Sequence, residues 1–133
     1  MQDYVSIVRT DNRLRRAAYR LKNLRREVKE FYWGHTVTPD ILELRNLVAT
    51  ASIIIDSAQL RKESRGSHYR TDFPTRNDGD FLRTTVARYD PASEQPELSY
   101  ESVETGLVVP RERNYTTTHA PAKDKKTPAA AGA

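Results

Sequence analysis

The chain has 133 residues, with 22 Lys and Arg against 18 Asp and Glu, so its formal net charge is +4. This length suits one ordinary domain or a small domain with tails. Because cysteine is absent, a disulfide framework, a thiolate metal site and a cysteine nucleophile are excluded.

The sequence contains no run of about 18 apolar residues, so it predicts no membrane span. Its start, Met1-Gln2-Asp3-Tyr4, has neither the basic nor the apolar region of a secretory signal, and we expect a cytoplasmic protein. The apolar residues that follow, Val5, Ile7 and Val8, have a spacing that suits one helical turn or a short strand. These residues look like the end of an element that began earlier.

The strongest periodic signal predicts a long amphipathic helix over residues 11–33. Thr10, Asp11 or Asn12 can cap its start, because a short side-chain oxygen accepts a free backbone N–H. Gly34 follows the last apolar residue, and we expect it in the left-handed conformation that ends many helices. The apolar residues recur at steps of three and four, which places them on one face: Leu14, Ala17, Ala18, Leu21, Leu24, Val28, Phe31 and Tyr32.

A second helix is predicted to begin at Thr38-Pro39, because Thr caps well and Pro fits the first helical position. We expect it to run for about 25 residues and to end near Arg65-Gly66. The short link over 34–37 makes the two helices antiparallel. The second apolar face is wider than one partner can cover, so we expect a further helix from a longer chain or from another chain. Its residues are Ile41, Leu44, Leu47, Val48, Ala51, Ile54, Ile55 and Ala58.

The composition changes after Gly66. Residues 67–80 are polar and predict an ordered or ligand-bound loop. Residues 81–89 and 98–103 alternate loosely around a turn-like segment, which predicts a β-hairpin. We expect residues 106–115 to be extended and residues 116–133 to be disordered. The predicted fold is mainly α: an antiparallel helical hairpin or three-helix bundle over 1–66, a charged loop plus β-hairpin over 67–115, and the tail over 116–133.

Motifs for common cofactors and for catalysis are missing from the sequence. The glycines are scattered singly, so neither a dinucleotide-binding G-x-G-x-x-G turn nor a phosphate-binding loop can be built. His35, His68 and His119 have no partners at metal-ligand spacing. Ser64 and Ser67 lack a nucleophile-elbow motif. We therefore expect no catalytic residue, cofactor or metal in this chain alone.

Basic residues concentrate in the first predicted helix. Such a stripe can bind phosphates or an acidic protein surface, and it is also typical of a solvated helix face with Glu27 and Glu30 nearby. Since no regular aromatic or base-reading pattern accompanies it, we expect no nucleic-acid partner. The arginines are Arg9, Arg13, Arg15, Arg16, Arg20, Arg25 and Arg26.

A dense charged run, RKESRGSHYRTDFP and on to residue 78, follows the second predicted helix. Bidentate arginine–carboxylate contacts would pin such a loop in place. We favour pairing inside the chain, for example Glu63 with Arg70 or Arg65 with Asp72. The alternative is contact with the active-site domain of an enzyme.

Several segments also share a family pattern. The most specific is Glu63-Ser64-Arg65-Gly66, followed by His68 and then by Asp72-Phe73-Pro74. With the Tyr32-Trp33 pair and the segment LELRNL, it resembles the C-terminal helical domain of L-aspartate oxidases within the succinate dehydrogenase/fumarate reductase flavoprotein family. Residues 75–78 and the predicted hairpin are more similar to the succinate dehydrogenase/fumarate reductase branch. The resemblance covers residues 3–115, with Ser6 where the family commonly has Gly and Ser67 where it has Leu or Ala.

The resemblance implies a three-helix bundle that packs on the flavin-binding and capping domains of an oxidoreductase. FAD and the substrate-binding residues would belong to those other domains, so no catalytic residue is carried over. The chain would be a fragment, a split subunit or a truncated reading frame. The resemblance assigns interdomain contact to Glu63, Ser64, Arg65, Gly66, His68, Arg70 and Asp72, and we add Arg76 as a candidate contact.

The same resemblance implies the activity of the whole enzyme. It points first to L-aspartate oxidase, which converts L-aspartate to iminoaspartate in NAD biosynthesis. A succinate dehydrogenase/fumarate reductase flavoprotein is one alternative. A non-catalytic helical adaptor with an arginine-rich face is the other.

Overall fold

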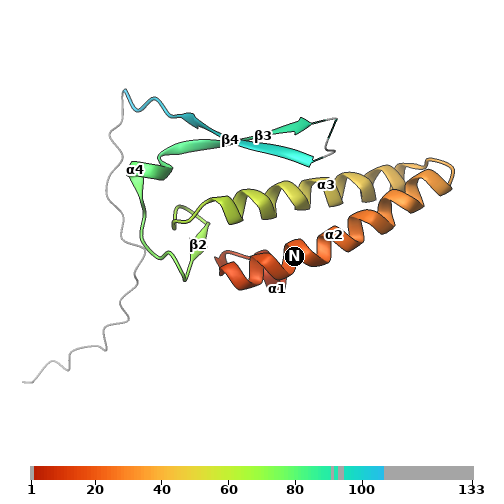
Figure 1. Ribbon diagram of the computed structural model, residues 1–133, viewed down its shortest axis with the longest axis horizontal. Helices are drawn as coiled ribbons and strands as arrows, with labels where there is room; N and C mark the ends of the chain where they lie inside the picture. Colours follow the sequence, from red (N-terminus) through yellow and green to blue (C-terminus); the bar gives the residue numbers. More distant parts are fainter. Residues whose placement is uncertain (1, 91, 93–94, 107–133) are drawn as a thin grey trace, which may run out of the picture.

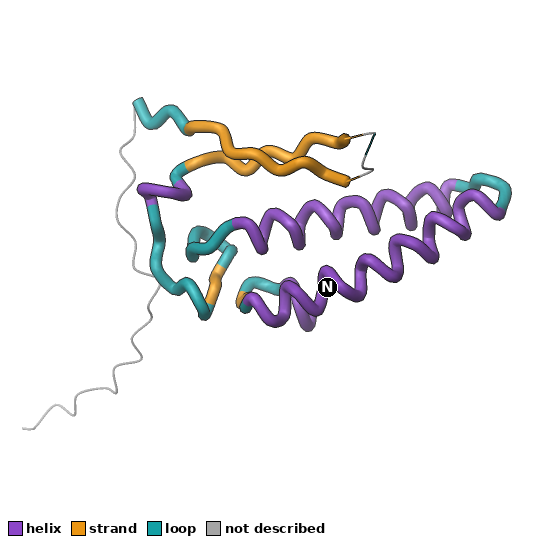
Figure 2. The backbone as a smooth tube through the Cα atoms, in the orientation of Figure 1, coloured by secondary structure: helices purple, strands orange, loops and turns teal. Residues whose placement is uncertain are grey.

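The computed structural model describes residues 2–90, 92 and 95–106, and this part of the chain is mainly helical. Two long helices, α2 (Asp11–Gly34) and α3 (Pro39–Leu60), pack side by side and antiparallel (Figure 1). A β-hairpin made of β3 (Arg83–Asp90) and β4 (Gln95–Ser102) lies along α3 (Figure 2). The predicted helical hairpin followed by a small β-hairpin is confirmed. The extended stretch and disordered tail that the sequence predicts lie, from residue 107 onward, outside the described residues.

Local capping chemistry sets the first residue of both long helices. Thr10 Oγ1 accepts the backbone N–H of Arg13 at 3.2 Å, so Thr10 is the cap among the predicted candidates. Thr38 Oγ1 accepts the backbone N–H of Ile41 at 3.4 Å. Pro39 lies in the first turn of α3, where a missing N–H costs no helical hydrogen bond. The predicted start at Thr38-Pro39 is confirmed.

Both helix ends differ from the prediction. Gly34 is the last residue of α2 and is not left-handed. His35 follows in an extended conformation, and its Nδ1 donates to the Phe31 carbonyl at 2.9 Å, which satisfies an acceptor at the helix end. The predicted end of α3 near Gly66 is also wrong, because α3 stops at Leu60. Arg61 leaves the helix with an extended backbone and sends its side chain to the β-hairpin.

The start of the chain forms both a helical turn and a short strand, the two structures that the spacing of its apolar residues suits. Residues Gln2–Val5 form the single helical turn α1, and Val8–Arg9 form the short strand β1. β1 pairs in parallel with β2 (Tyr69–Arg70), which brings the start of the chain next to the loop after α3.

A small core lies where α1, α2 and α3 meet. Its buried members are Val5, Leu14, Ala17, Ile55 and Ala58, with Tyr4, Ala18 and Leu21 packed against them. Elsewhere the helices leave large apolar side chains in solvent. None of the helices in the described part of the chain is long and apolar enough to cross a membrane.

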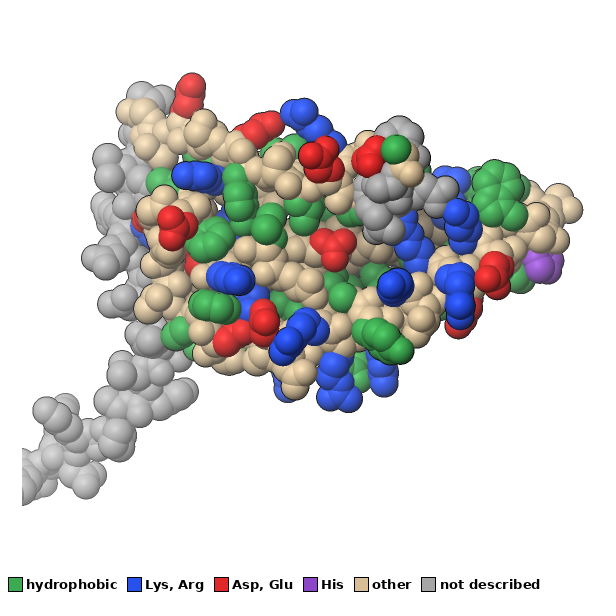
Figure 3. Space-filling model, viewed as in Figure 1, with side chains coloured by type: hydrophobic (Ala, Val, Ile, Leu, Met, Phe, Trp, Pro, Cys, Tyr) green, Lys and Arg blue, Asp and Glu red, His purple; other side chains and the backbone are tan. Residues whose placement is uncertain are grey.

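The basic stripe of α2 faces solvent. Basic side chains gather along α2 on the face seen in Figure 3, and Arg15, Arg16 and Arg20 are exposed. The guanidinium carbons of Arg16 and Arg20 lie 5.9 and 5.0 Å from the centre of the Tyr4 ring. These cation–π contacts hold α1 against α2.

The loop after α3 is shaped by a two-residue turn at Gly66 and by a second short helix. Gly66 has a φ of 58°, and Arg65 and His68 exchange backbone hydrogen bonds of 2.9 and 3.0 Å across the turn. The single-turn helix α4 (Asp78–Phe81) then leads into β3. The hairpin register runs from Arg83 opposite Ser102 to Asp90 opposite Gln95.

We expect Gly66→Ala to lower the free energy of unfolding by about 1–2 kcal/mol, because a side chain in the left-handed conformation is strained. A Cβ at Gly66 meets no atom within 4 Å, so the cost comes from the backbone alone. Urea unfolding followed by circular dichroism measures it. The control is Gly34→Ala, which also meets no atom and has no left-handed backbone. Equal stability of the two variants would contradict the prediction.

Candidate functional site

The candidate site is the charged loop that leaves α3, which we call the exit cluster. It comprises the charged and polar side chains of residues 61–78 together with Arg9 and Asp11. Two of its charged side chains, Glu63 and Arg70, are fully buried, and so is Ser64. A buried charge is costly unless it is paired and hydrogen-bonded, so the partners of these residues determine the shape of the loop.

The buried carboxylate of Glu63 accepts four hydrogen bonds. Arg65 donates to both carboxylate oxygens, at 2.8 and 3.0 Å, in a bidentate pair. Arg61 donates to Oε1 at 2.5 Å, and the backbone N–H of Asn77 donates to Oε2 at 2.9 Å. Burial raises the pKa of Glu63, but the hydrogen bonds from Arg65, Asn77 and Arg61 outweigh it and leave the pKa below its usual value. Glu63 is therefore an ionised anchor.

The buried guanidinium of Arg70 joins three parts of the chain. It forms a bidentate pair with Asp72 at 2.8 and 2.7 Å, and it donates to Asp11 Oδ1, at the start of α2, at 2.8 Å. It also donates to the carbonyl of Ala58, near the end of α3, at 3.0 Å. The guanidinium carbon lies 5.0 Å from the centre of the Phe73 ring. One side chain thus connects both long helices and the loop.

Asp72 is held ionised by these contacts. The hydrogen bond from Arg70 lowers the pKa of Asp72 to about 2, against an opposing effect of burial. The backbone N–H of Asp11 donates to Asp72 Oδ2 at 2.9 Å and adds to the effect. In return, the Asp72 carboxylate raises the pKa of Arg70.

His68 is a structural residue that bridges two arginines. A carbonyl can only accept a hydrogen bond, so His68 Nε2 carries the proton and donates to the Arg61 carbonyl at 3.1 Å. In this neutral tautomer Nδ1 has no proton, and it accepts a hydrogen bond from Arg9 at 2.6 Å. Burial lowers the pKa of His68, and the positive charges of Arg9 and Arg70 lower it further, although the hydrogen bond to the Arg61 carbonyl opposes them. His68 is therefore kept neutral.

Ser64 and Asp78 complete the exit cluster. Ser64 Oγ accepts a hydrogen bond from the backbone N–H of Arg70 at 2.8 Å and donates one to the carbonyl of Phe73 at 2.8 Å. Its hydroxyl thus connects two points of the loop backbone. Asp78 pairs with Arg76 and, at 2.5 Å, with Arg65. The hydrogen bond from Arg76, followed by that from Arg65, lowers the pKa of Asp78.

Arg61 links the exit cluster to the β-hairpin. It donates to the carbonyl of Phe81 at 2.8 Å and to that of Arg83 at 2.6 Å, and it reaches Thr85 Oγ1 at 3.2 Å. Its guanidinium carbon is also 6.0 Å from the centre of the Tyr100 ring. The hairpin is therefore fixed to the end of α3 through this arginine.

The structure brings the predicted site residues together but pairs them differently. The charged loop forms a network inside the chain, yet the suggested pairs Glu63–Arg70 and Arg65–Asp72 are wrong. Glu63 bonds Arg65 and Arg70 bonds Asp72 instead, because each of these arginines lies two residues from its carboxylate in the tight loop. Gly66 lies at the exposed turn. Sequence reasoning included Arg61, Asn77 and Asp78 in the charged run without naming their partners, and it missed Arg9 and Asp11 as members of the network.

The exit cluster does not fit a flavin or a metal ion. In the residues that the structure describes, every buried side-chain nitrogen and oxygen already has a hydrogen-bond partner, so the cluster offers no orphaned donor to a phosphate or an isoalloxazine ring. The same residues contain no group of three or more His, Asp and Glu placed to hold a metal. The side chains of the cluster bond to one another and connect the loop to α2 and α3.

We expect Arg70→Met to lower the free energy of unfolding by about 3–5 kcal/mol, because it leaves Asp72, Asp11 and the carbonyl of Ala58 without their buried partner. The control is Arg88→Met, which removes an exposed pair with Glu101 at 3.4 Å and should cost less than about 1 kcal/mol. Denaturant titration of both variants measures the difference. Similar losses in the two variants would show that the buried network does not hold the fold.

Stability should fall in two steps as pH decreases. His68 has a lowered pKa in the folded chain, so below about pH 6.5 protons bind the unfolded chain preferentially and favour unfolding. Asp72, whose pKa is about 2 in the fold, adds a second loss as pH falls below about 4. Unfolding free energies measured from pH 7 to 2 should show both steps. His68→Gln should remove the first step and keep the second; an unchanged first step would contradict this assignment.

Comparisons with known proteins identify the family of this chain. Residues 1–115 match the family described as fumarate reductase flavoprotein C-term. L-aspartate oxidase 1 of Ralstonia nicotianae is 54% identical over 74 residues, which are 56% of this chain and 14% of the relative. The L-aspartate oxidase of Pseudomonas aeruginosa is 53% identical over 74 residues, with the same coverage of 56% and 14%.

A second branch of the family matches more of the chain at lower identity. The succinate dehydrogenase flavoprotein subunit of Bacillus subtilis is 31% identical over 118 residues, which are 84% of this chain and 20% of the relative. The chain thus spans between 14% and 20% of the length of these three relatives. It belongs to the C-terminal domain family of fumarate reductase and succinate dehydrogenase flavoproteins.

Proposed function

We propose that this chain serves as the C-terminal domain of an FAD-dependent oxidoreductase and that the whole enzyme is an L-aspartate oxidase. The observation that carries the proposal is the identity of 54% over 74 residues with an L-aspartate oxidase, against 31% over 118 residues with the succinate dehydrogenase subunit. Such an enzyme would convert L-aspartate to iminoaspartate in NAD biosynthesis. Its cytoplasmic location stays a prediction from the sequence.

The role proposed for this chain is to dock on the flavin-binding and capping domains. Glu63, Ser64 and Arg70 are fully buried within the chain, so they would act by holding the loop in shape. Exposed atoms for a contact come from their neighbours: the side chains of Arg65 and Asp72 are 26% and 29% exposed, and Gly66 lies at the exposed turn. A loop that is rigid before docking loses little conformational entropy when it binds.

A succinate dehydrogenase or fumarate reductase flavoprotein is the second candidate. The match to the Bacillus subtilis subunit extends over 84% of the chain, whereas the match to the aspartate oxidases covers 56%. The longer match favours this branch even though the identity is lower. The substrate depends on residues outside this chain, so the two candidates must be separated by experiment.

A pair of chimeric enzymes tests the proposal. In the first, residues 1–115 replace the matched C-terminal segment of the Ralstonia nicotianae L-aspartate oxidase; in the second, they replace that of the Bacillus subtilis subunit. We expect the first chimera to keep bound flavin and to reduce it with L-aspartate, because the chain is 54% identical to this relative over 74 residues. We expect the second to lose most of its succinate-dependent flavin reduction. Anaerobic bleaching of the flavin absorbance measures both.

The controls are the two parent enzymes and the 133-residue chain alone, which should purify without flavin. Activity of the succinate chimera together with an inactive aspartate chimera would favour the second candidate. Inactivity of both chimeras, or stoichiometric flavin in the chain alone, would contradict the docking role.

A further inference from the structure

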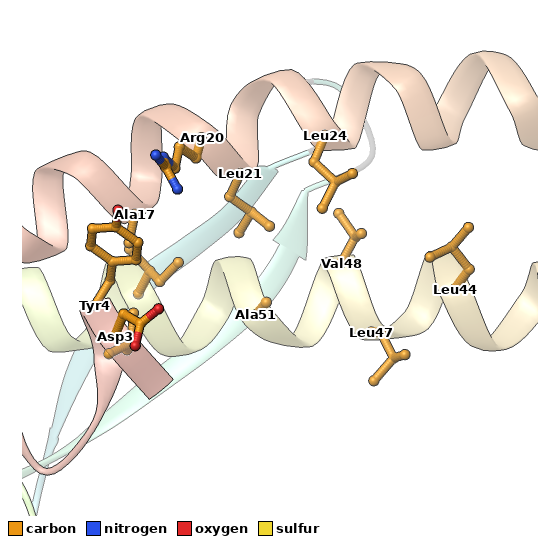
Figure 4. Close-up of a pocket in the computed structure, with 12 residues that line it drawn as sticks. Asp3, Tyr4, Ala17, Arg20, Leu21, Leu24, Leu44, Leu47, Val48 and Ala51 are labelled. Carbon is orange, nitrogen blue, oxygen red and sulfur yellow. The ribbon is translucent and has the colours of Figure 1, made fainter. Parts of the chain in front are cut away.

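Two of the pockets beside the paired helices differ in chemistry. The larger is an apolar groove of about 580 Å³ between α2 and α3, lined mainly by aliphatic side chains such as Leu24, Leu44 and Leu47 (Figure 4). The other, which we call the aromatic pocket, has a volume of about 460 Å³ and is lined from α2, α3 and the end of β3. Small-molecule sites usually have volumes of about 300–1,000 Å³ and combine an apolar lining with a few polar groups that orient the ligand. The aromatic pocket meets this description.

The aromatic pocket has an apolar floor and exposed rings. Val28 of α2 and Val48 of α3 line it and are buried, so they form its floor. Trp33, near the end of α2, and Tyr89, in β3, also line it and are 76% and 70% exposed. Exposed rings beside a pocket can stack on a flat ligand, because every flat ring has a π-face.

Arg45 supplies a positive charge that is already held in place. Its guanidinium carbon lies 5.1 Å from the centre of the Tyr32 ring, and its Nη1 donates to Tyr32 Oη at 3.3 Å. Its Nε and Nη2 donate to Asn46 Oδ1 at 3.4 and 3.2 Å. These bonds use three of the five N–H groups of the guanidinium, so among the described residues one N–H on each terminal nitrogen remains for a ligand. A group that is fixed before binding loses little conformational entropy when the ligand arrives.

The charge of the lining favours an anion. Of the described residues that line the aromatic pocket, the charged ones are Arg25, Lys29 and Arg45, and all are basic. Arg25 and Lys29 make further interactions of their own, so the anion contact is assigned to Arg45. Tyr32 places this charge beside the exposed ring of Trp33, because the Tyr32 and Trp33 rings meet edge to face with centroids 5.3 Å apart. An aromatic surface and a cation thus lie next to each other.

We propose that the aromatic pocket binds a flat aromatic anion, that is, a ring that carries a carboxylate or a phosphate. Arg45 donates hydrogen bonds to the anionic group, and the ring stacks against Trp33 and Tyr89. The inference goes beyond the proposed function and is independent of it, because every residue it uses lies in the described part of this chain.

The fluorescence of Trp33 tests the proposal in the 133-residue chain, because the sequence has a single tryptophan. The probes are AMP for a phosphate and benzoate for a carboxylate. Adenosine and benzyl alcohol lack the charge, and inorganic phosphate lacks the ring. We expect AMP, benzoate or both to change the fluorescence saturably, with a Kd about tenfold or more below those of the uncharged compounds and of inorganic phosphate. Higher salt should weaken this binding, because it screens an exposed charge.

Matched substitutions locate the ligand. Tyr89→Ala and Arg45→Gln should each raise the Kd about tenfold, since the first removes a stacking ring and the second removes the charge. Tyr89→Phe keeps the ring and should bind like the original chain. The controls are Tyr19→Ala, at a tyrosine that is also 70% exposed, and Arg26→Gln, at an exposed arginine of α2; neither residue lines the aromatic pocket. Circular dichroism checks that every variant is folded.

Each result supports or overturns the proposal. Binding of AMP alone identifies a phosphate as the anion, binding of benzoate alone identifies a carboxylate, and either supports it. Equal binding of the uncharged compounds, or no binding of either anionic probe, overturns it. A Kd that changes in only one of Tyr89→Ala and Arg45→Gln also overturns it, because the ligand must use both the ring and the charge. So does a control variant that weakens binding as much as its counterpart in the pocket.

Discussion

The fold depends on the buried guanidinium of Arg70. Its partners are Asp11 at the start of α2, the carbonyl of Ala58 near the end of α3, and Asp72 in the loop after α3. These groups are far apart in the sequence, and the apolar core that joins α2 to α3 is small. Buried ion pairs add little net stability over an apolar replacement, but loss of one partner is costly. Arg70 therefore acts mainly to select one arrangement of the helices and the loop.

Glu63 repeats this design with the opposite charge. It accepts hydrogen bonds from Arg65, Arg61 and the backbone N–H of Asn77. Arg61 also donates to carbonyl groups at the start of the β-hairpin. The two buried charges lie in one short loop, so the positions of the helices and the hairpin are coupled through it. Such coupling suits a domain that must present a fixed surface to a larger protein, because the surface is formed before contact.

The parts of the structure that follow from nearby residues could be predicted from the sequence, and the parts set by distant residues could not. Thr38 and Pro39 fix the start of α3 through contacts within one turn. The end of α3 is different, because Arg61 turns away to reach carbonyls 20 and 22 residues further on. Likewise, nothing near Asp72 in the sequence indicates that its carboxylate also receives the backbone N–H of Asp11, 61 residues earlier. The sequence therefore predicts that these charged residues form one network, but not which of them pair, and their role as interdomain contacts stays a prediction.

The charged loop differs from the apolar groove between α2 and α3, which Leu24, Leu44 and Leu47 help to line, in what it requires of a partner. Every buried polar side-chain atom in the described residues is already satisfied, so the exit cluster can exist in the chain by itself. The groove still exposes apolar surface, since Leu24, Leu44 and Leu47 remain in contact with solvent. Burial of apolar surface is favourable whatever the direction from which the covering group comes. The polar network, by contrast, specifies one geometry. The exit cluster therefore specifies the geometry of the loop, whereas the groove leaves apolar surface whose burial would stabilise the fold.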